Sequence, residues 1–127
     1  MKALWISLIS LALILGTWLF FMNASKESIN EMVQIIEEET YPMAFSESWA
    51  DASYSFEKVS RHWKKNKRTF ILFTDSEAVA EAEYSFQRIR SFIETGEKGS
   101  LCAELVYLKR QLLFLRELEI LSIENII

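Results

Sequence analysis

The hydrophobic and polar positions divide the chain into one long uncharged stretch and a series of helical repeats. Residues 3–22 contain no charged side chain. From residue 29 onward, hydrophobic residues recur at intervals of three and four, which is the periodicity of an amphipathic helix. No stretch shows the strict alternation that is typical of a half-buried strand. The pattern therefore predicts an all-α protein.

The first two amphipathic helices are separated by a proline. The apolar face of the first lies at Ile29, Met32, Val33 and Ile36. Pro42 is expected to end or kink this helix, because the residue before a proline disfavours the helical region. The apolar face of the second lies at Phe45, Trp49, Ala52, Phe56, Val59 and Trp63. This helix is expected to continue through residues 70–73.

Two more helices follow, each with its own start signal. Thr74 and Glu77 form a candidate capping box for the third, whose apolar face lies at Val79, Ala82, Phe86, Ile89 and Ile93. Gly96 suits the left-handed position just past its end, and Ser100 is a suitable N-cap for the fourth. The fourth carries Leu101, Leu105, Leu108, Leu112 and Leu115. Shared spacing and a short link favour a small antiparallel bundle of three to four helices over residues 23–127.

The uncharged stretch predicts a transmembrane helix at residues 3–22. Twenty residues at about 1.5 Å each span roughly 30 Å, the thickness of the hydrocarbon core of a bilayer. A cleaved signal peptide is the alternative, but the run is longer than the usual apolar region of a signal peptide. A cut after Ala24 would also place Met22 at a small-residue position. We therefore expect an uncleaved signal-anchor.

The charges beside this span set its expected orientation. Lys2 and the N-terminal amine lie on one side, and Lys26 lies on the other. By the positive-inside rule, residues 1–2 are expected in the cytoplasm and residues 23–127 outside the cell membrane. The single Cys102 fits either compartment, because one thiol cannot form an internal disulfide.

The aromatic residues raise the question of a binding site. Trp49 and Trp63 are fourteen residues apart, which places them about 21 Å apart along one helix. Two rings so distant cannot enclose one ligand, so we expect them to fill separate core layers. The predicted structural core comprises Trp49, Phe56, Trp63, Phe86, Leu105, Leu108 and Leu112.

Candidate chemistry is otherwise sparse. His62 has no acidic residue three or four positions away, and Cys102 lies on another helix. The sequence has no Glu-x-x-His motif for a metal and no glycine-rich phosphate loop. Glu77, Glu81 and Glu83 are interpreted as a solvated face. No catalytic, cofactor-binding or metal-binding residue is predicted, and the net charge of −4 does not favour nucleic acid.

One charged cluster suggests a function. Five cations occur within eight residues without an acidic residue among them: Arg61, Lys64, Lys65, Lys67 and Arg68. A solvated helix face is the simple interpretation. If the chain turns back at Pro42, however, this cluster returns toward the membrane, where each cation attracts anionic lipid by about 1 kcal/mol. The cluster is therefore a candidate contact for lipid headgroups or a partner.

Several motifs together resemble a known family. They are Trp49 and Trp63, Leu101 with Glu104, Leu105 and Leu108, and the closing residues 124–127. The chain is similar over nearly its whole length to domain of unknown function 4363, a family of small bacterial proteins common in spore-forming Firmicutes. Members of that family often carry a histidine where residues 74–76 stand here. The resemblance implies a single-pass bacterial membrane protein and no established activity.

These observations favour a non-enzymatic, membrane-tethered helical domain without a cofactor. Its expected partners are membrane lipid and a membrane protein or a second copy of the chain. An extracytoplasmic sensor or small-ligand-binding bundle is the alternative, and it would need a separate output subunit.

Overall fold

The computed structural model describes the backbone of residues 1–126 and their side chains except 21–25, 73 and 122–126. The all-α class is confirmed, since the described part contains helices and no strand. The elements in order are α1 (Lys2–Ile35), the π-helix η1 (Ile36–Thr40), α2 (Tyr41–Phe45), α3 (Trp49–Phe73), α4 (Ser76–Thr95) and α5 (Lys98–Ile126). The side chains at the end of the predicted apolar run and in the C-terminal motif 124–127 lie outside the described residues.

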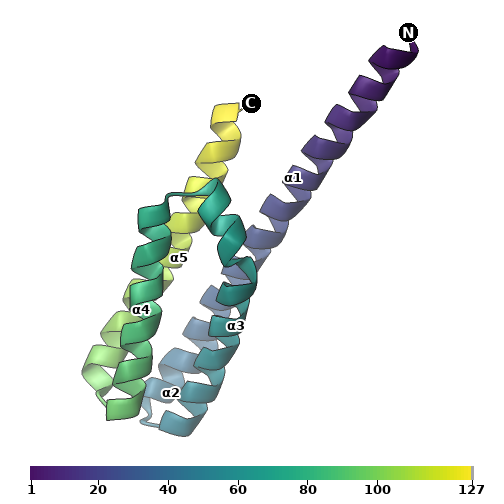
Figure 1. Ribbon diagram of the computed structural model, residues 1–127. Helices are drawn as coiled ribbons and strands as arrows, with labels where there is room; N and C mark the ends of the chain where they lie inside the picture. Colours follow the sequence, from purple (N-terminus) through teal and green to yellow (C-terminus); the bar gives the residue numbers. More distant parts are fainter. Residues whose placement is uncertain (127) are drawn as a thin grey trace.

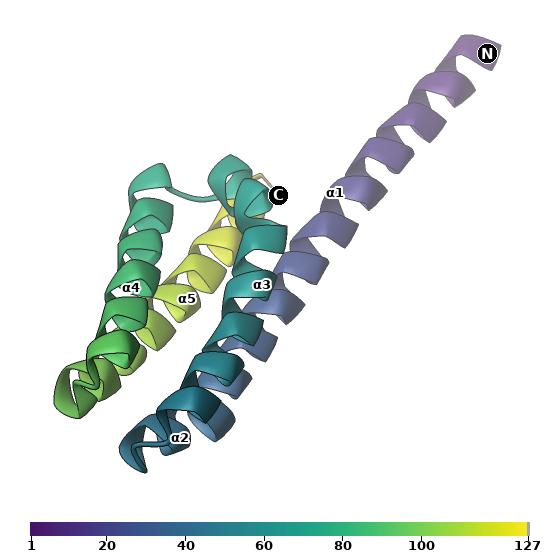
Figure 2. The same ribbon diagram turned by 60° about the horizontal axis from the view of Figure 1, so that its bottom comes forward.

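Four long helices form the bundle. The second half of α1 lies beside α3, α3 contacts α4, and α4 contacts α5 (Figure 1). Each of these neighbours runs antiparallel to the one before it, as Figures 1 and 2 show. Contacts between α5 and α1 close the ring. The helical bundle predicted from the apolar spacing is therefore the observed architecture.

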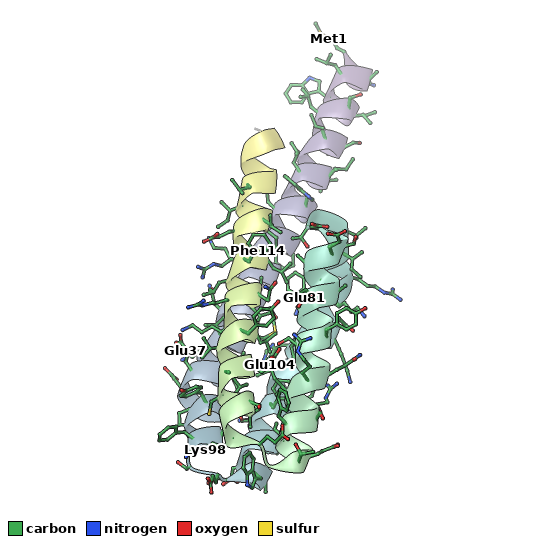
Figure 3. The ribbon with its side chains drawn as sticks, turned by 90° about the vertical axis from the view of Figure 1, so that its left-hand side faces the viewer. Met1, Glu37, Glu81, Lys98, Glu104 and Phe114 are labelled. Carbon is green, nitrogen blue, oxygen red and sulfur yellow. The ribbon has the colours of Figure 1, made fainter. Side chains whose placement is uncertain are left out.

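The first half of α1 projects from this bundle. Residues Lys2–Phe20 have a mean hydropathy of 2.1, and none of them is buried. Figure 3 shows the Met1 end of α1 lying well beyond the other helices. This segment is long and apolar enough to cross a membrane, and by length and composition it suits a membrane span or a signal sequence.

The predicted apolar faces meet in a single core. In α5 the five leucines of the predicted face are fully buried. The other helices contribute buried residues at Ile29, Met32, Ile36, Ala52, Phe56, Val59, Trp63, Phe70, Val79, Ala82, Phe86 and Ile89. Val33 and Ile93 are half-buried and pack against them. Spacings of three and four follow the helical period, so these residues share one face of each helix.

Of the two outcomes expected at Pro42, a helix end or a kink, the helix end does not occur. Tyr41, which precedes the proline, has helical angles of φ −64° and ψ −48°, and the chain stays helical to Phe45. A proline in a regular α-helix clashes with the carbonyl four residues earlier. We attribute the wider π-turn of η1 to this constraint. Thr40, at the end of η1, shares a buried hydrogen bond of 2.5 Å with the hydroxyl of Ser55 in α3.

The chain reverses direction at residues 46–48, later than expected. Glu47 takes a left-handed conformation there, with φ 60°. Phe45 belongs to α2 and is exposed, so its predicted place on the apolar face of α3 is wrong. Its ring lies 4.3 Å from Nζ of Lys98 instead.

The ends of α4 and α5 differ in part from the prediction. Asp75, and not Thr74, caps α4 by accepting a hydrogen bond of 3.0 Å from the amide of Glu77. Gly96 has φ 68°, as expected for a left-handed helix end. The prediction of Ser100 as an N-cap is wrong, because α5 begins at Lys98.

Candidate functional site: the cationic face of α3

The helical period places four of the five clustered cations on one face of α3. Arg61, Lys64, Lys65 and Arg68 follow the spacing i, i+3, i+4 and i+7, so they lie side by side on the helix surface. All four are exposed. The buried side chains of α3 occupy the opposite side, because their spacing is offset by about half a turn. We call these four residues the cationic face.

Lys67, the fifth cation, belongs to a different environment. Its Nζ lies 3.0 Å from Oε1 of Glu83 in α4. The same oxygen accepts a hydrogen bond of 2.7 Å from Nε1 of Trp63. Burial opposes the charge of Glu83, but these hydrogen bonds outweigh it and lower the pKa of that carboxyl. Lys67 therefore joins α3 to α4 and is not part of the cationic face.

The cationic face is not paired with carboxylates of the described residues. None of its four residues forms an ion pair or hydrogen bond with another side chain in the part of the chain that the structure describes. Several other cations of the bundle are paired, as Lys58 is with Glu39 at 3.1 Å. Unpaired cations on one side of a helix produce a local positive potential, although the whole chain is acidic.

A shallow groove adjoins this face where α3 meets α1. It has a volume of about 320 Å³ and is lined by Ile35, Lys58, Arg61, His62 and Lys65. His62 lies 3.5 Å from Oε2 of Glu31, which partly occupies its hydrogen-bonding capacity. Arg61 and Lys65 face the groove without such a partner. An anionic group is therefore the chemistry that the groove suits best.

A hydrogen bond sets the level of the cationic face along α1. Nδ2 of Asn66 donates to Oγ of Ser28 at 2.7 Å. Because α3 and α1 are antiparallel, each residue after Asn66 lies about 1.5 Å closer to the projecting half of α1. Arg68 is thus the cation nearest to the apolar segment, and Arg61 is about 10 Å farther away.

The core assignment agrees with the structure except at one position. Trp63 is 3% exposed and its ring lies between Phe70 and Phe86, at 5.3 Å from each. Phe56, Phe86, Leu105, Leu108 and Leu112 are buried. Trp49 is only half-buried and lies against the turn at Gly96. The two tryptophans therefore occupy different environments.

The interpretation of the α4 carboxylates as a solvated face is wrong for two of the three. Glu83 accepts a hydrogen bond from Trp63 and pairs with Lys67. Glu81 accepts a hydrogen bond of 2.7 Å from the hydroxyl of Tyr107 in α5. Nearby, Glu104 of α5 accepts from Arg88 and Ser85 of α4 at 2.9 Å each (Figure 3). These bonds hold α4 and α5 together on the side away from the core.

The residues considered for a Cys–His pair do not form one. No hydrogen bond joins His62 and Cys102, and Cys102 lies in the first turns of α5, near Lys98. Burial raises the pKa of the Cys102 thiol, although Lys98 opposes this effect. A less acidic thiol is a poorer nucleophile at neutral pH.

Glu119 was not singled out from the sequence. It is 2% exposed, and neither carboxylate oxygen has a hydrogen-bond partner among the described residues. Burial raises its pKa to about 7. The signal was present in the spacing, because Glu119 follows Leu115 by four residues and thus continues the leucine face of α5.

The comparisons with known proteins give one match. Residues 19–126 match a protein family described as a domain of unknown function, DUF4363. No curated protein and no solved structure matches the chain.

Proposed function

The chain belongs to the DUF4363 family, for which no activity is described, and we propose that it is a membrane-tethered helical domain. The tether is the projecting half of α1, and the bundle acts by binding and not by catalysis. Its partners are membrane lipid and a membrane protein or a second copy of the chain. The cationic face is the surface that we assign to this role.

The proposal rests on one observation: α1 is a continuous helix whose first half is exposed and whose second half packs into the bundle. Its 34 residues correspond to about 51 Å. Ile29 and Met32 in its second half are fully buried in the core, whereas Leu4, Trp5 and other large apolar residues in its first half are exposed. Soluble proteins rarely leave so large an apolar surface in water. A bilayer would cover this surface without any change in the bundle.

The charge distribution supports binding as the mode of action. The described acidic side chains of α4 and α5 near the core are largely engaged in interhelical bonds, as for Glu83 and Glu104. The cationic face is the contrasting region, with four charges on one side that no described side chain pairs. Such a surface attracts an acidic partner and orients it, at little cost to the fold.

The alternative, a sensor or small-ligand-binding bundle, depends on a suitable cavity. An apolar cleft lies between η1, α2 and α5 and has a volume of about 190 Å³. It is lined by Ile36, Glu37, Tyr41, Leu105, Val106 and Lys109. Sites for drug-sized ligands usually measure about 300–1,000 Å³. The apolar cleft is smaller than this, and the groove of about 320 Å³ beside the cationic face is shallow and lined mainly by charged side chains. We therefore favour a surface that binds lipid or protein over a ligand-binding cavity.

Retention in the membrane tests the tether. Membranes from cells that express the full chain are washed with alkaline carbonate, and the mass of the intact protein is measured. We expect the complete chain in the pellet. A soluble species that begins near residue 25 would show that the segment is a cleaved signal sequence and would end the proposal.

Orientation requires its own measurement, because it rests on the charges beside the span. A cysteine at Glu97, in the exposed turn between α4 and α5, is treated in intact cells with a thiol reagent that cannot cross membranes. Cys102 is replaced by serine to remove the native thiol. We expect labelling of intact cells, whereas labelling only after lysis would place the bundle in the cytoplasm.

A further inference from the structure

The exposed side of α3 changes from cationic to apolar near the end of the helix. Ile71 and Leu72 follow Arg68 by three and four residues, so they continue the cationic face in the same direction. Ile71 is 45% exposed and Leu72 is 77% exposed. Within about one turn, the cations therefore give way to apolar side chains. Leu72 is largely exposed, whereas Ile71 also lines a groove toward α4.

This apolar end of α3 lies level with the end of the apolar segment of α1. The hydrogen bond between Asn66 and Ser28 aligns the two helices. Leu72 comes six residues after Asn66, so it lies about 9 Å closer to the projecting half of α1. That distance brings it close to the level of Phe20, where the apolar segment ends.

The end of α5 comes within about one helical turn of the same level. Nη1 of Arg116 donates a hydrogen bond of 2.7 Å to Oδ1 of Asn30, which aligns α5 with α1. Leu121, five residues later, is 52% exposed and lies about 7.5 Å closer to the apolar segment. Figures 1 and 2 show the α3–α4 turn and the end of α5 on the side of the bundle from which α1 projects.

We infer that this end of the bundle docks on the bilayer that holds α1. Ile71, Leu72 and Leu121 enter the interfacial layer, and the cationic face binds anionic lipid headgroups beside them. The inference rests on the proposed membrane tether and adds a second, separate lipid contact to it. The order of residues along α3 matches the layers of a bilayer. The apolar pair Ile71 and Leu72 contacts the boundary of the acyl chains, and the cations contact the phosphates above it.

The bilayer is the occupant that the geometry selects. Because α1 is continuous between the apolar segment and the bundle, a bilayer around residues Lys2–Phe20 ends close to the level of Leu72. The surface is thus held beside the membrane at high effective concentration. Arg68 lies about 9 Å from that boundary, roughly one Debye length, and attracts phosphate groups most strongly, whereas Arg61 is about 20 Å away and largely screened. Salt weakens this attraction further.

Contact quenching in vesicles tests the inference with the full chain. In a Cys102→Ser background, an NBD fluorophore is attached to one introduced cysteine at a time: Leu11→Cys, Leu72→Cys or Glu97→Cys. The protein is reconstituted into vesicles of phosphatidylcholine and phosphatidylglycerol, with or without bromine on the acyl chains. We expect brominated lipid to quench the fluorophore at positions 11 and 72 and to leave position 97 unchanged.

The three positions separate the inference from the proposal on which it rests. Position 11 reports insertion of the apolar segment, and position 97 reports the far end of the bundle. Quenching at 11 without quenching at 72 overturns the docking and leaves the tether intact. Loss of quenching at 11 overturns both.

A matched pair of charge variants tests the headgroup contact. Lys64→Gln with Lys65→Gln removes two charges from the cationic face, and Lys98→Gln with Arg110→Gln removes two from elsewhere on the surface. We expect only the first pair to reduce quenching at position 72, and 1 M salt to have the same effect on the parent. If quenching at position 72 is the same in both double variants, the cationic face does not bind the headgroups.

Discussion

Nε1 of Trp63 donates a hydrogen bond of 2.7 Å to Oε1 of Glu83, which joins the aromatic core of α3 to the surface of α4. The indole lies between Phe70 and Phe86, so one side chain fills the core and also binds a carboxylate. Lys67 completes the group by pairing with the same oxygen. This residue group therefore determines how α4 packs on α3.

Trp63→Ala should lower the free energy of unfolding by about 3–5 kcal/mol, because it empties a buried aromatic site. Trp63→Phe keeps the ring stacking and loses only the donor to Glu83, so we expect a cost of about 1 kcal/mol. Trp49→Ala should cost less than Trp63→Ala, since Trp49 is half-buried. Denaturant unfolding of the full chain in detergent measures all three. An equal loss for both alanine variants would contradict the difference in burial.

Glu119 should make stability depend on pH near neutrality. Burial raises its pKa from the ordinary value of 4.5 to about 7. Between these values the folded protein binds an extra proton at Glu119. The contribution of Glu119 to stability is therefore fully present below about pH 4.5 and is lost as pH rises through 7. Ionisation costs on the order of 3 kcal/mol.

Thermal unfolding of parent and Glu119→Gln across this pH window measures the effect. We expect the variant to lack the decline, and to be more stable than the parent at pH 8. Glu117→Gln is the control, because Glu117 is exposed and lies two residues earlier in the same helix. If the stability of the parent and of Glu119→Gln changed with pH to the same extent, this carboxyl would not be held in an apolar site.

The two glycines around the α4–α5 turn should respond in opposite ways to alanine. Gly96 has φ 68°, so Gly96→Ala should cost about 1–2 kcal/mol for the left-handed conformation. Gly99 lies in the first turn of α5 with no atom within 4 Å of an added Cβ. Gly99→Ala should be neutral or stabilising by up to about 1 kcal/mol. Thermal unfolding of the two variants distinguishes them, and a loss at position 99 would contradict the helical start at Lys98.

Removal of the cationic face should leave the fold intact. Changing Arg61, Lys64, Lys65 and Arg68 together to glutamine should alter the free energy of unfolding by no more than about 0.5 kcal/mol per residue, because the four are exposed and unpaired. Lys67→Gln should lower stability slightly, by up to about 1 kcal/mol, through its pair with Glu83. Scanning calorimetry compares the variants. If the fourfold variant were unfolded, these residues would be required for the fold.

The helices and their buried sides follow from local sequence alone. Residues at spacings of three and four lie on one side of any α-helix, so the buried leucines of α5 and the apolar side of α4 were predictable without knowing their partners. The uncharged run was predictable for the same reason, because length and hydropathy are properties of one segment. Local sequence did not decide between a helix end and a kink at Pro42, where a single π-turn accommodates the proline within a continuous helix.

Pairing between helices depended on register, which no single segment contains. Lys64 and Lys67 are both lysines of α3 and lie three residues apart. Of the two, Lys67 forms an ion pair, because α4 places Glu83 beside it. Glu119 has the spacing of a core residue, but only packing decided that its carboxyl would be buried without a partner. The hydrogen bond from Asn66 to Ser28 likewise decides how far α3 reaches along α1. The level of Leu72 beside the apolar segment is a consequence of that alignment, since helices offer many registers of similar local energy and tertiary packing selects one.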